Sequence, residues 1–167
     1  MTTTFELTHE FENISLDKFE KYLNHEILNN LLEKELDFVS RKLVKTSNNK
    51  HNTSWIFEVK KKANLPSAIR NMIKSDTISW QEESLFNSKD HSISWEITPL
   101  TKGLNFVAKG IAKLSHTKNG CIRHLSGSVS VSIPLVGKLI ENTIVKELVR
   151  NYDIEPNIQK KFYDSMP

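Results

Sequence analysis

The stretch from Gly127 to Tyr152, which reads GSVSVSIPLVGKLIENTIVKELVRNY, decides the fold. In its first part serine alternates with valine or isoleucine, and this alternation predicts a half-buried strand. Pro134 ends the strand, because proline has no N–H to donate to a neighbouring strand. From Val136 onward an apolar residue recurs every four positions, which predicts a helix of several turns with a wide apolar stripe. We therefore expect a strand that leads, without a loop, into a long C-terminal helix starting near Pro134–Gly137.

Upstream of this junction the sequence patterns predict one sheet and three short helices. Apolar and polar residues alternate over Phe5–Phe11, which predicts a first strand, and two short helical patterns follow, one capped by Ser15 and one around Ile27–Leu32. Six further strand patterns span residues 37–45, 54–62, 77–86, 91–99, 104–116 and 121–133. The short separators NSKD, LTKG and TKNG favour antiparallel hairpins, because parallel strands need long crossovers. A third short helix is expected within Asn64–Asp76, and Pro156 is expected to kink or break the last helix.

These elements predict a single α+β domain over residues 1–167. It would consist of an antiparallel sheet of about seven strands wrapped around the long C-terminal helix, with two short helices after the first strand. A sheet with one apolar face needs a cover, and the last helix is the only predicted element large enough to provide it. A chain of 167 residues suits one domain and is short for two.

Composition narrows the class of protein. The 23 basic and 20 acidic residues give a net charge of +3, which is not the signature of a nucleic-acid-binding domain, and we expect no nucleic-acid partner. The single cysteine, Cys121, excludes an internal disulfide and favours a reducing compartment; we expect its thiol to be inert. The first residues do not form a secretory signal, and no stretch reaches the roughly 18–20 apolar residues that span a bilayer. We therefore expect a soluble, cytoplasmic protein.

Two stretches of the sequence carry a resemblance to a known superfamily. They read LPSAIRNMIKSDTISWQEE over Leu65–Glu83 and GSVSVSIPLVGKLIENTIVKELV over Gly127–Val149, with a weaker likeness in FELTHEFEN over Phe5–Asn13. With the order of elements over nearly the whole chain, they resemble the START-like (SRPBCC, helix-grip) superfamily, and most of all an uncharacterised bacterial family within it. The shared motifs are patterns of apolar spacing and not catalytic signatures.

The resemblance implies a curved sheet that grips the C-terminal helix and leaves a cavity between them. The superfamily includes START lipid-transfer domains, birch-pollen-allergen-like proteins, polyketide cyclases and PRELI phospholipid carriers, so it contains both carriers and enzymes. The expected function is the binding or carriage of a hydrophobic small molecule, with a lipid as the expected ligand. The alternatives are a cyclase-type enzyme and a protein-interaction module whose sheet and helix pack without a cavity.

The candidate ligand contacts are apolar and aromatic residues that share the inward parity of strands or the stripe of the last helix. Three tryptophans fall in three different strand patterns, which suggests an aromatic pocket of the kind that ligands favour, although the same rings could fill a solid core. Two polar residues on the inward parity, a histidine and a glutamate, complete the set. The candidates are Trp55, Phe57, Trp80, Trp95, Phe106, Ile140, Ile144, Leu148, His9 and Glu82.

The polar candidates have two interpretations each. His9 could contact a ligand headgroup, or it could bond to the backbone at a strand end, and Glu82 is either a residue at the cavity mouth or a functional acid. A cyclase-type enzyme would use these two side chains, or His124 in the last strand, for proton transfer. The sequence contains no H-E-x-x-H or G-x-S-x-G motif and no metal-ligand spacing, so we assign no catalytic residue, no metal and no cofactor.

Three consecutive lysines suggest a contact with membranes. Lys60, Lys61 and Lys62 precede the short helix within Asn64–Asp76, whose apolar side would carry Ile69, Met72 and Ile73. A basic, amphipathic lip at the cavity entrance would suit transient docking to an anionic membrane surface. The alternative is a solvated strand end followed by a helix packed on the sheet.

Overall fold

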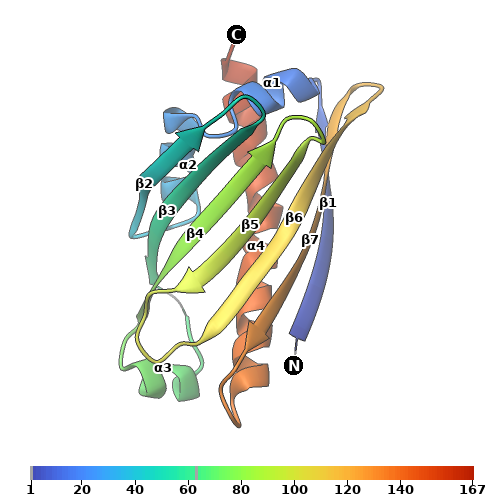
Figure 1. The fold of residues 1–167 in the computed structure, drawn as a ribbon. Coiled ribbons are helices and arrows are strands. Elements are labelled where there is room, and N and C mark those ends of the chain that lie inside the picture. Colours follow the sequence, from blue (N-terminus) through green and yellow to red (C-terminus); the bar gives the residue numbers. More distant parts are fainter. Residues whose placement is uncertain (1, 63) are drawn as a thin grey trace.

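One antiparallel sheet of seven strands, in the order β1-β7-β6-β5-β4-β3-β2, dominates the computed structural model, which describes residues 2–62 and 64–167 (Figure 1). The strands are β1 (Thr2–Glu12), β2 (Ser40–Asn48), β3 (Asn52–Lys62), β4 (Thr77–Asn87), β5 (Ser92–Pro99), β6 (Phe106–Thr117) and β7 (Gly120–Val131). The helices are α1 (Leu16–Lys21), α2 (Glu26–Glu35), α3 (Ser67–Ile73) and α4 (Gly137–Ser165). The α+β class, the seven strands, the long C-terminal helix and the two short helices after the first strand are confirmed.

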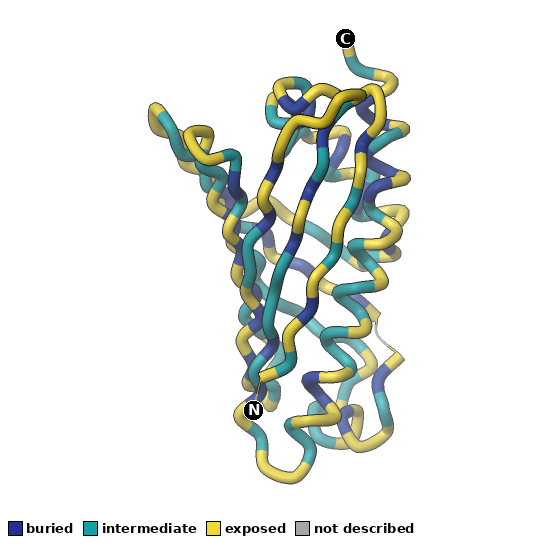
Figure 2. Tube along the Cα trace, turned by 90° about the vertical axis from the view of Figure 1, so that its right-hand side faces the viewer, coloured by how far each residue is buried: buried dark blue, intermediate teal, exposed yellow. Residues whose placement is uncertain are grey.

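The first strand of the chain lies beside the last strand in the sheet. β1 pairs with β7 along its whole length, from Thr2 opposite Ser130 to Glu12 opposite Gly120. The other strands form consecutive antiparallel neighbours from β2 to β7. Exposed and buried residues alternate along most strands, so the sheet has an outer face toward solvent and an inner face toward α4 (Figure 2).

Helix α4 runs along the inner face of the sheet, with α1 and α2 near its C-terminal end and α3 near its start (Figure 1). Ile158, Phe162 and Tyr163 near the end of α4 are buried in one cluster with residues of α1 and α2. Ile140 near its start is buried in a second cluster that includes Ile69 of α3. The core therefore has two packed ends, and α4 connects them.

The junction between β7 and α4 contains a short loop that the sequence pattern did not predict. Residues 132–136 separate Val131 from Gly137, and Leu135 adopts a left-handed φ of 67° as the chain reverses toward the sheet. The first turn of α4 is then fixed to the sheet by Glu141, whose carboxylate accepts hydrogen bonds from the Val131 N–H at 3.2 Å and the Thr3 hydroxyl at 2.9 Å. Burial opposes the charged form of Glu141, but these bonds hold the pKa of its carboxyl below the ordinary value.

Of the kink or break expected at Pro156, the break is wrong, because α4 continues through this residue from Gly137 to Ser165. Proline removes the N–H that would bond to the carbonyl of Tyr152. Pro156 is nevertheless buried, and the apolar residues that follow it are anchored in the cluster with α1 and α2. Tertiary packing on the C-terminal side therefore maintains the helix despite the lost hydrogen bond.

Two glycines on the inner face make room for large aromatic rings. Gly110 lies opposite Gly127 in neighbouring strands, and Trp95 and Phe5 lie opposite them in the next strands on either side. A Cβ atom at Gly110 would lie 2.6 Å from the Trp95 ring, and one at Gly127 would lie 2.6 Å from the Phe5 ring. The absence of two side chains therefore lets the Trp95 ring extend over both glycines.

Candidate ligand-binding cavity

A cavity of about 160 Å³ lies between the inner face of the sheet, α2 and the middle of α4. Its walls are mainly apolar and contain four large aromatic side chains from β3, β4, β5 and α4. The apolar walls comprise Phe19, Leu23, Leu28, Leu32, Leu36, Phe38, Trp55, Trp80, Ile93, Trp95, Ile97, Ala112, Leu125, Leu148 and Tyr152. The polar side chains on its walls are Asn29, Arg41, Glu82, Ser84, Arg123, Asn151, Glu155 and Gln159. We call this space the larger cavity.

A smaller chamber of about 80 Å³ adjoins the larger cavity toward α3. The two spaces share Trp80, Ile97, Leu148 and Asn151 as walls. The other walls of the smaller chamber are Lys61, Asn64, Leu65, Ile69, Ile78, Leu104, Phe106, Ile140, Thr143, Ile144 and Glu147. An apolar chamber beside a cavity with a polar wall suits a molecule with an apolar body and one polar group.

The middle of α4 is packed less tightly than its ends. Ile144, Leu148 and Tyr152 are only partly buried although they face the sheet, whereas Ile140 and Ile158 on either side are buried. Because Leu148 and Tyr152 line the larger cavity and Ile144 lines the smaller chamber, their remaining accessible surface faces these two spaces. The middle of α4 therefore borders open space, whereas both of its ends are packed.

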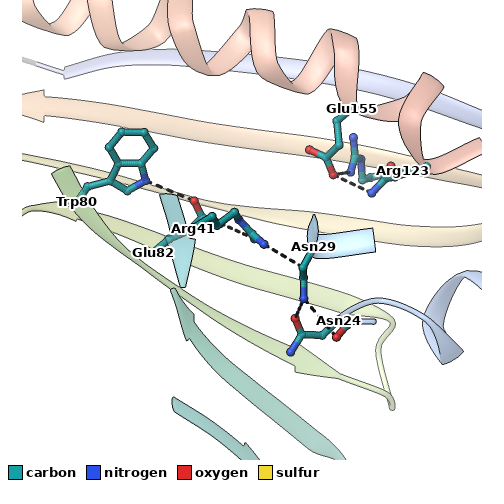
Figure 3. Close-up of polar contacts among 8 residues, drawn as sticks. Asn24, Asn29, Arg41, Trp80, Glu82, Arg123 and Glu155 are labelled. Atoms are coloured by element: carbon teal, nitrogen blue, oxygen red, sulfur yellow. Dashed lines mark hydrogen bonds and ion pairs between the residues drawn. The ribbon is translucent and has the colours of Figure 1, made fainter. Parts of the chain in front are cut away.

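An ion pair between β2 and β4 forms one polar wall of the larger cavity (Figure 3). The Arg41 Nη2 atom lies 3.2 Å from Glu82 Oε1, and the Trp80 indole N–H donates to Glu82 Oε2 at 3.4 Å. Arg41 also donates to Asn29 Oδ1 at 2.9 Å, and Asn29 donates to Asn24 Oδ1 at 2.8 Å. Glu82 thus points inward, as its parity predicted, but both of its oxygens accept hydrogen bonds from neighbours.

A second ion pair joins β7 to α4 (Figure 3). Arg123 Nη1 lies 3.1 Å from Glu155 Oε1, and the Gln159 side-chain amide donates to the same oxygen at 2.7 Å. Arg123 Nη2 also lies 3.2 Å from His9 Nδ1, while His9 Nε2 lies 3.5 Å from Asp153. Burial and the neighbouring guanidinium lower the pKa of His9, which favours the neutral ring that accepts at Nδ1 and donates at Nε2.

Three buried polar atoms on the walls of the larger cavity have no hydrogen-bond partner among the described residues. They are Trp95 Nε1, Arg123 Nε and Gln159 Oε1. Their side chains are more than nine-tenths buried. A buried donor or acceptor without a partner costs roughly 1–3 kcal/mol, and these three atoms are enclosed by packed neighbours instead of facing the open space.

The family of the chain follows from its sequence as a whole. A family described as "Protein of unknown function (DUF2505)" matches residues 7–162, which is most of the chain. The chain belongs to this family. No curated protein matches it in sequence.

Solved structures that resemble this DUF2505 chain share its fold at low sequence identity. TTHA0849 from Thermus thermophilus is 12% identical with a TM-score of 0.63, and the match covers 99% of this chain and 100% of that one. The Zhui aromatase/cyclase from Streptomyces sp. R1128 is 8% identical with a TM-score of 0.63 over 98% of this chain and 93% of its own. The di-domain aromatase/cyclase StfQ from the steffimycin biosynthetic pathway is 15% identical with a TM-score of 0.68, covering 98% of this chain and 51% of its own. These likenesses show a helix-grip fold.

Eight of the ten candidate residues lie on the walls of the two spaces. Trp55, Trp95 and Glu82 line the larger cavity, Phe106, Ile140 and Ile144 line the smaller chamber, and Trp80 and Leu148 line both. Their contact with a ligand remains a prediction.

The other two candidates, Phe57 and His9, lie off the walls. Phe57 is buried, and the guanidinium carbon of Arg41 lies 3.6 Å from the centre of its ring, so a residue of the edge strand covers it. His9 points inward as its parity predicted, but its two ring nitrogens already contact the side chains of Arg123 and Asp153. His9 therefore supports the second ion pair from the side and does not face the cavity.

His124, which a cyclase-type enzyme would need to point inward for proton transfer, does not do so. His124 lies on the outer face, where its Nδ1 atom is 3.0 Å from the Thr8 hydroxyl, because the inward positions of β7 belong to its neighbours Arg123 and Leu125. Cys121 is buried beside them, and burial raises the pKa of its thiol to about 11, which agrees with an inert thiol.

The basic lip predicted from the three lysines is wrong in two of its residues. Lys61 is buried, lines the smaller chamber, and places its ammonium 3.6 Å from Glu147 and 3.4 Å from Asn151. Only Lys60 and Lys62 are exposed, because alternate residues of a strand face opposite sides of the sheet. Ile69 is also buried, so it packs in the core instead of facing outward.

Three further observations concern regions outside the two spaces. Among residues 2–62 and 64–167, no helix is long and apolar enough to cross a membrane, and no group of three or more His, Cys, Asp or Glu side chains is arranged to hold a metal ion. A broad hollow of about 1060 Å³ lies on the outer face of the sheet over Glu6, Glu83, Glu96 and Lys109. It is open to solvent, so a molecule there would stay in contact with water.

Proposed function

We propose that this domain binds a hydrophobic small molecule between its sheet and α4. The observation that supports this proposal best is the pair of adjoining spaces, one mainly apolar and one whose apolar walls also carry two ion pairs and several other polar side chains. Burial of apolar ligand atoms would supply the affinity, at about 0.8 kcal/mol for each methylene removed from water. The polar side chains on the walls of the larger cavity would orient the molecule.

The size of the larger cavity limits the ligand. An apolar cavity of roughly 150 Å³ is enough to hold benzene, so a space of about 160 Å³ holds one ring or a short chain without rearrangement. A lipid, the ligand expected from the sequence, would need a single chain that extends from the larger cavity into the smaller chamber. A two-chain phospholipid would require the partly buried middle of α4 to move away from the sheet.

The cyclase-type alternative has less support in the geometry. Of its three proposed acid–base residues, Glu82 is held by Arg41 and Trp80, His9 lies off the walls, and His124 lies on the outer face. Tyr152 offers a hydroxyl at the cavity, and burial raises the pKa of this hydroxyl, so it stays protonated at neutral pH. A carrier needs such a donor only for orientation, and carriage is therefore the function we favour.

Native mass spectrometry of the protein purified from its own host tests the proposal. We expect a non-covalent adduct whose mass identifies the class of ligand and which is lost when the protein is denatured. The same host preparation of a Leu148→Trp variant serves as the control, because Leu148 lines both spaces. An adduct that persists in this variant would place the ligand elsewhere on the molecule.

Filling the cavity should abolish binding while the fold survives. In Leu148→Trp the added ring would occupy the space that Leu148 now borders, so titration with an apolar fluorescent dye or a fatty acid should lose its signal. Leu139→Trp is the matched control, because Leu139 lies on the exposed side of the same helix and should leave binding as it is. If sheet and helix formed a solid core, Leu148→Trp would instead destabilise the fold by typically 1–3 kcal/mol through overpacking, and the parent protein would not bind.

We also propose a transient contact with anionic membranes that involves only the two exposed lysines of the run, Lys60 and Lys62. A basic residue near an anionic surface is worth about 1 kcal/mol, so Lys60 and Lys62 would give weak binding that salt removes. Sedimentation with acidic vesicles at low salt should show binding that falls in a Lys60→Gln, Lys62→Gln variant, and neutral vesicles should not bind. Lys109→Gln on the outer face is the control. Equal binding by both variants would mean that the lysines are only a solvated strand end.

A further inference from the structure

One end of the molecule, near the start of α4, exposes apolar side chains to solvent. This end consists of residues 64–76 around α3, residues 100–105 between β5 and β6, and residues 132–141 between β7 and the first turn of α4 (Figure 1). The Ser132 N–H donates to the Asn105 carbonyl at 3.2 Å, and a Cβ atom at Gly103 would lie 3.7 Å from the Met72 carbonyl oxygen. The three segments therefore lie against one another, and we call their common surface the base.

Leu135 is the most exposed apolar residue of the base. Its exposed fraction is 106%, and its backbone adopts a left-handed φ of 67°. This conformation is unfavourable for leucine, because the Cβ atom crowds the following carbonyl oxygen. A strained residue of this kind is a reason to look for a function. Here the strained position holds an apolar side chain away from the core, where it can contact only something outside the domain.

Further exposed leucines and several basic residues surround this position in the same segments. Leu100 is 52% exposed and Leu139 is 43% exposed. The exposed basic residues of the three segments are Arg70, Lys74, Lys102 and Lys138. Their two acidic residues are already compensated, since Asp76 lies 3.4 Å from Lys62 and the buried Glu141 lies 3.3 Å from Lys138. The base therefore combines exposed leucines with a net positive charge.

The base also adjoins the smaller chamber. Leu65 and Ile69 from the first segment, Leu104 from the second and Ile140 from the third line this chamber. The same segments thus form the base on their outer side and a wall of the chamber on their inner side. A partner that contacts the base would lie next to the space in which an apolar ligand is proposed to bind.

We propose that the base docks on an anionic lipid bilayer and inserts Leu135 below the headgroups. A bilayer offers both a negative surface for the basic side chains and an apolar layer for the leucines. A second copy of this chain fits less well, because two bases would bring like charges together. The inference goes beyond the proposed function, in which Lys60 and Lys62 make an electrostatic contact only. Because Lys62 pairs with Asp76 of the base, both contacts can form in one orientation.

A fluorescent label at position 135 of the full-length protein tests the insertion. In Leu135→Cys the new thiol is labelled selectively with a nitrobenzoxadiazole group, because the native Cys121 is buried and its thiol has a pKa of about 11. With vesicles of phosphatidylglycerol and phosphatidylcholine, we expect the emission to shift to shorter wavelength as the label enters the lipid. The same label in Ile27→Cys is the control, since Ile27 is 52% exposed on α2, near the opposite end of α4, and should show no shift (Figure 1).

A second pair of variants measures binding without a label. Leu135→Asn should keep the fold, because asparagine tolerates the left-handed conformation. It should lower the partition onto the acidic vesicles about tenfold at physiological salt, where the electrostatic contribution is screened. Ile27→Gln removes a similarly exposed apolar side chain from α2 and should bind as the unaltered protein does.

Four results would overturn the inference. They are an unshifted label at position 135, a shift at both labelled positions, unchanged binding by Leu135→Asn, and a shift without vesicles that grows with protein concentration, which would identify a second copy as the partner. If Leu135→Asn binds normally while the Lys60→Gln, Lys62→Gln variant does not, the electrostatic contact stands alone. The mass-spectrometric adduct is measured without vesicles, so it judges ligand binding in the cavity separately.

Discussion

A chain that ends after Ile133 should lose cooperative unfolding altogether, because it lacks the helix that covers the inner face of the sheet. Helix α4 contributes Ile140, Ile158, Phe162 and Tyr163 to the two buried clusters. Full burial of one such side chain is worth about 1.5–3 kcal/mol, so these four together contribute as much as the whole net stability of a typical domain, about 5–15 kcal/mol. Urea titration followed by near-ultraviolet circular dichroism measures the effect.

A shorter truncation provides the control for this experiment. A chain that ends after Ser165 keeps all of α4 and loses only Met166 and Pro167, whose backbone oxygens accept hydrogen bonds from Lys18 and Tyr22. We expect it to unfold cooperatively at a slightly lower urea concentration. If the chain ending after Ile133 also unfolded cooperatively with a native-like spectrum, the sheet would be stable without α4 and the helix would not hold the fold together.

The fold was predictable because its signal is local. The alternation of serine with valine in β7 and the four-residue spacing that starts at Val136 each reflect which face of an element is buried. The same parity argument placed Trp55, Trp80 and Trp95 on the inner face, where the structure has them. Pro156 is the exception, because the packing that maintains α4 through it comes from α1 and α2, which are distant in sequence.

The polar part of the candidate site was not predictable in the same way. Arg41 and Arg123 lie on the inward parity of their strands, so a charged residue between apolar neighbours was a signal that could have found them. Their partners could not be found, because Glu82 is 41 positions from Arg41 and Glu155 is 32 positions from Arg123. Lys61 shares the parity of Phe57 and Val59, a signal that could have placed it inward, but the run of three lysines suggested a surface patch instead.

Replacing Arg123 by methionine should destabilise the protein by about 3–5 kcal/mol, because it leaves Glu155 without its cation in a buried environment. Only 5% of the Arg123 side chain and 17% of the Glu155 side chain are exposed, so water cannot replace the lost partner well. His9 would also lose the donor at its Nδ1 atom. Urea titration of the Arg123→Met variant against the unaltered protein measures the loss.

An exposed ion pair serves as the control that shows whether burial causes the loss of stability expected in Arg123→Met. Lys113 lies 3.4 Å from Asp90 with half of each side chain exposed, so Lys113→Met should hardly change the unfolding midpoint. The double variant Arg123→Met, Glu155→Met removes both charges and should recover much of the stability lost in Arg123→Met, because no unpaired charge remains. A loss in Arg123→Met no larger than that in Lys113→Met would show that Glu155 finds water or another partner when Arg123 is absent. The larger cavity would then contain enough water to solvate the Glu155 carboxylate without Arg123.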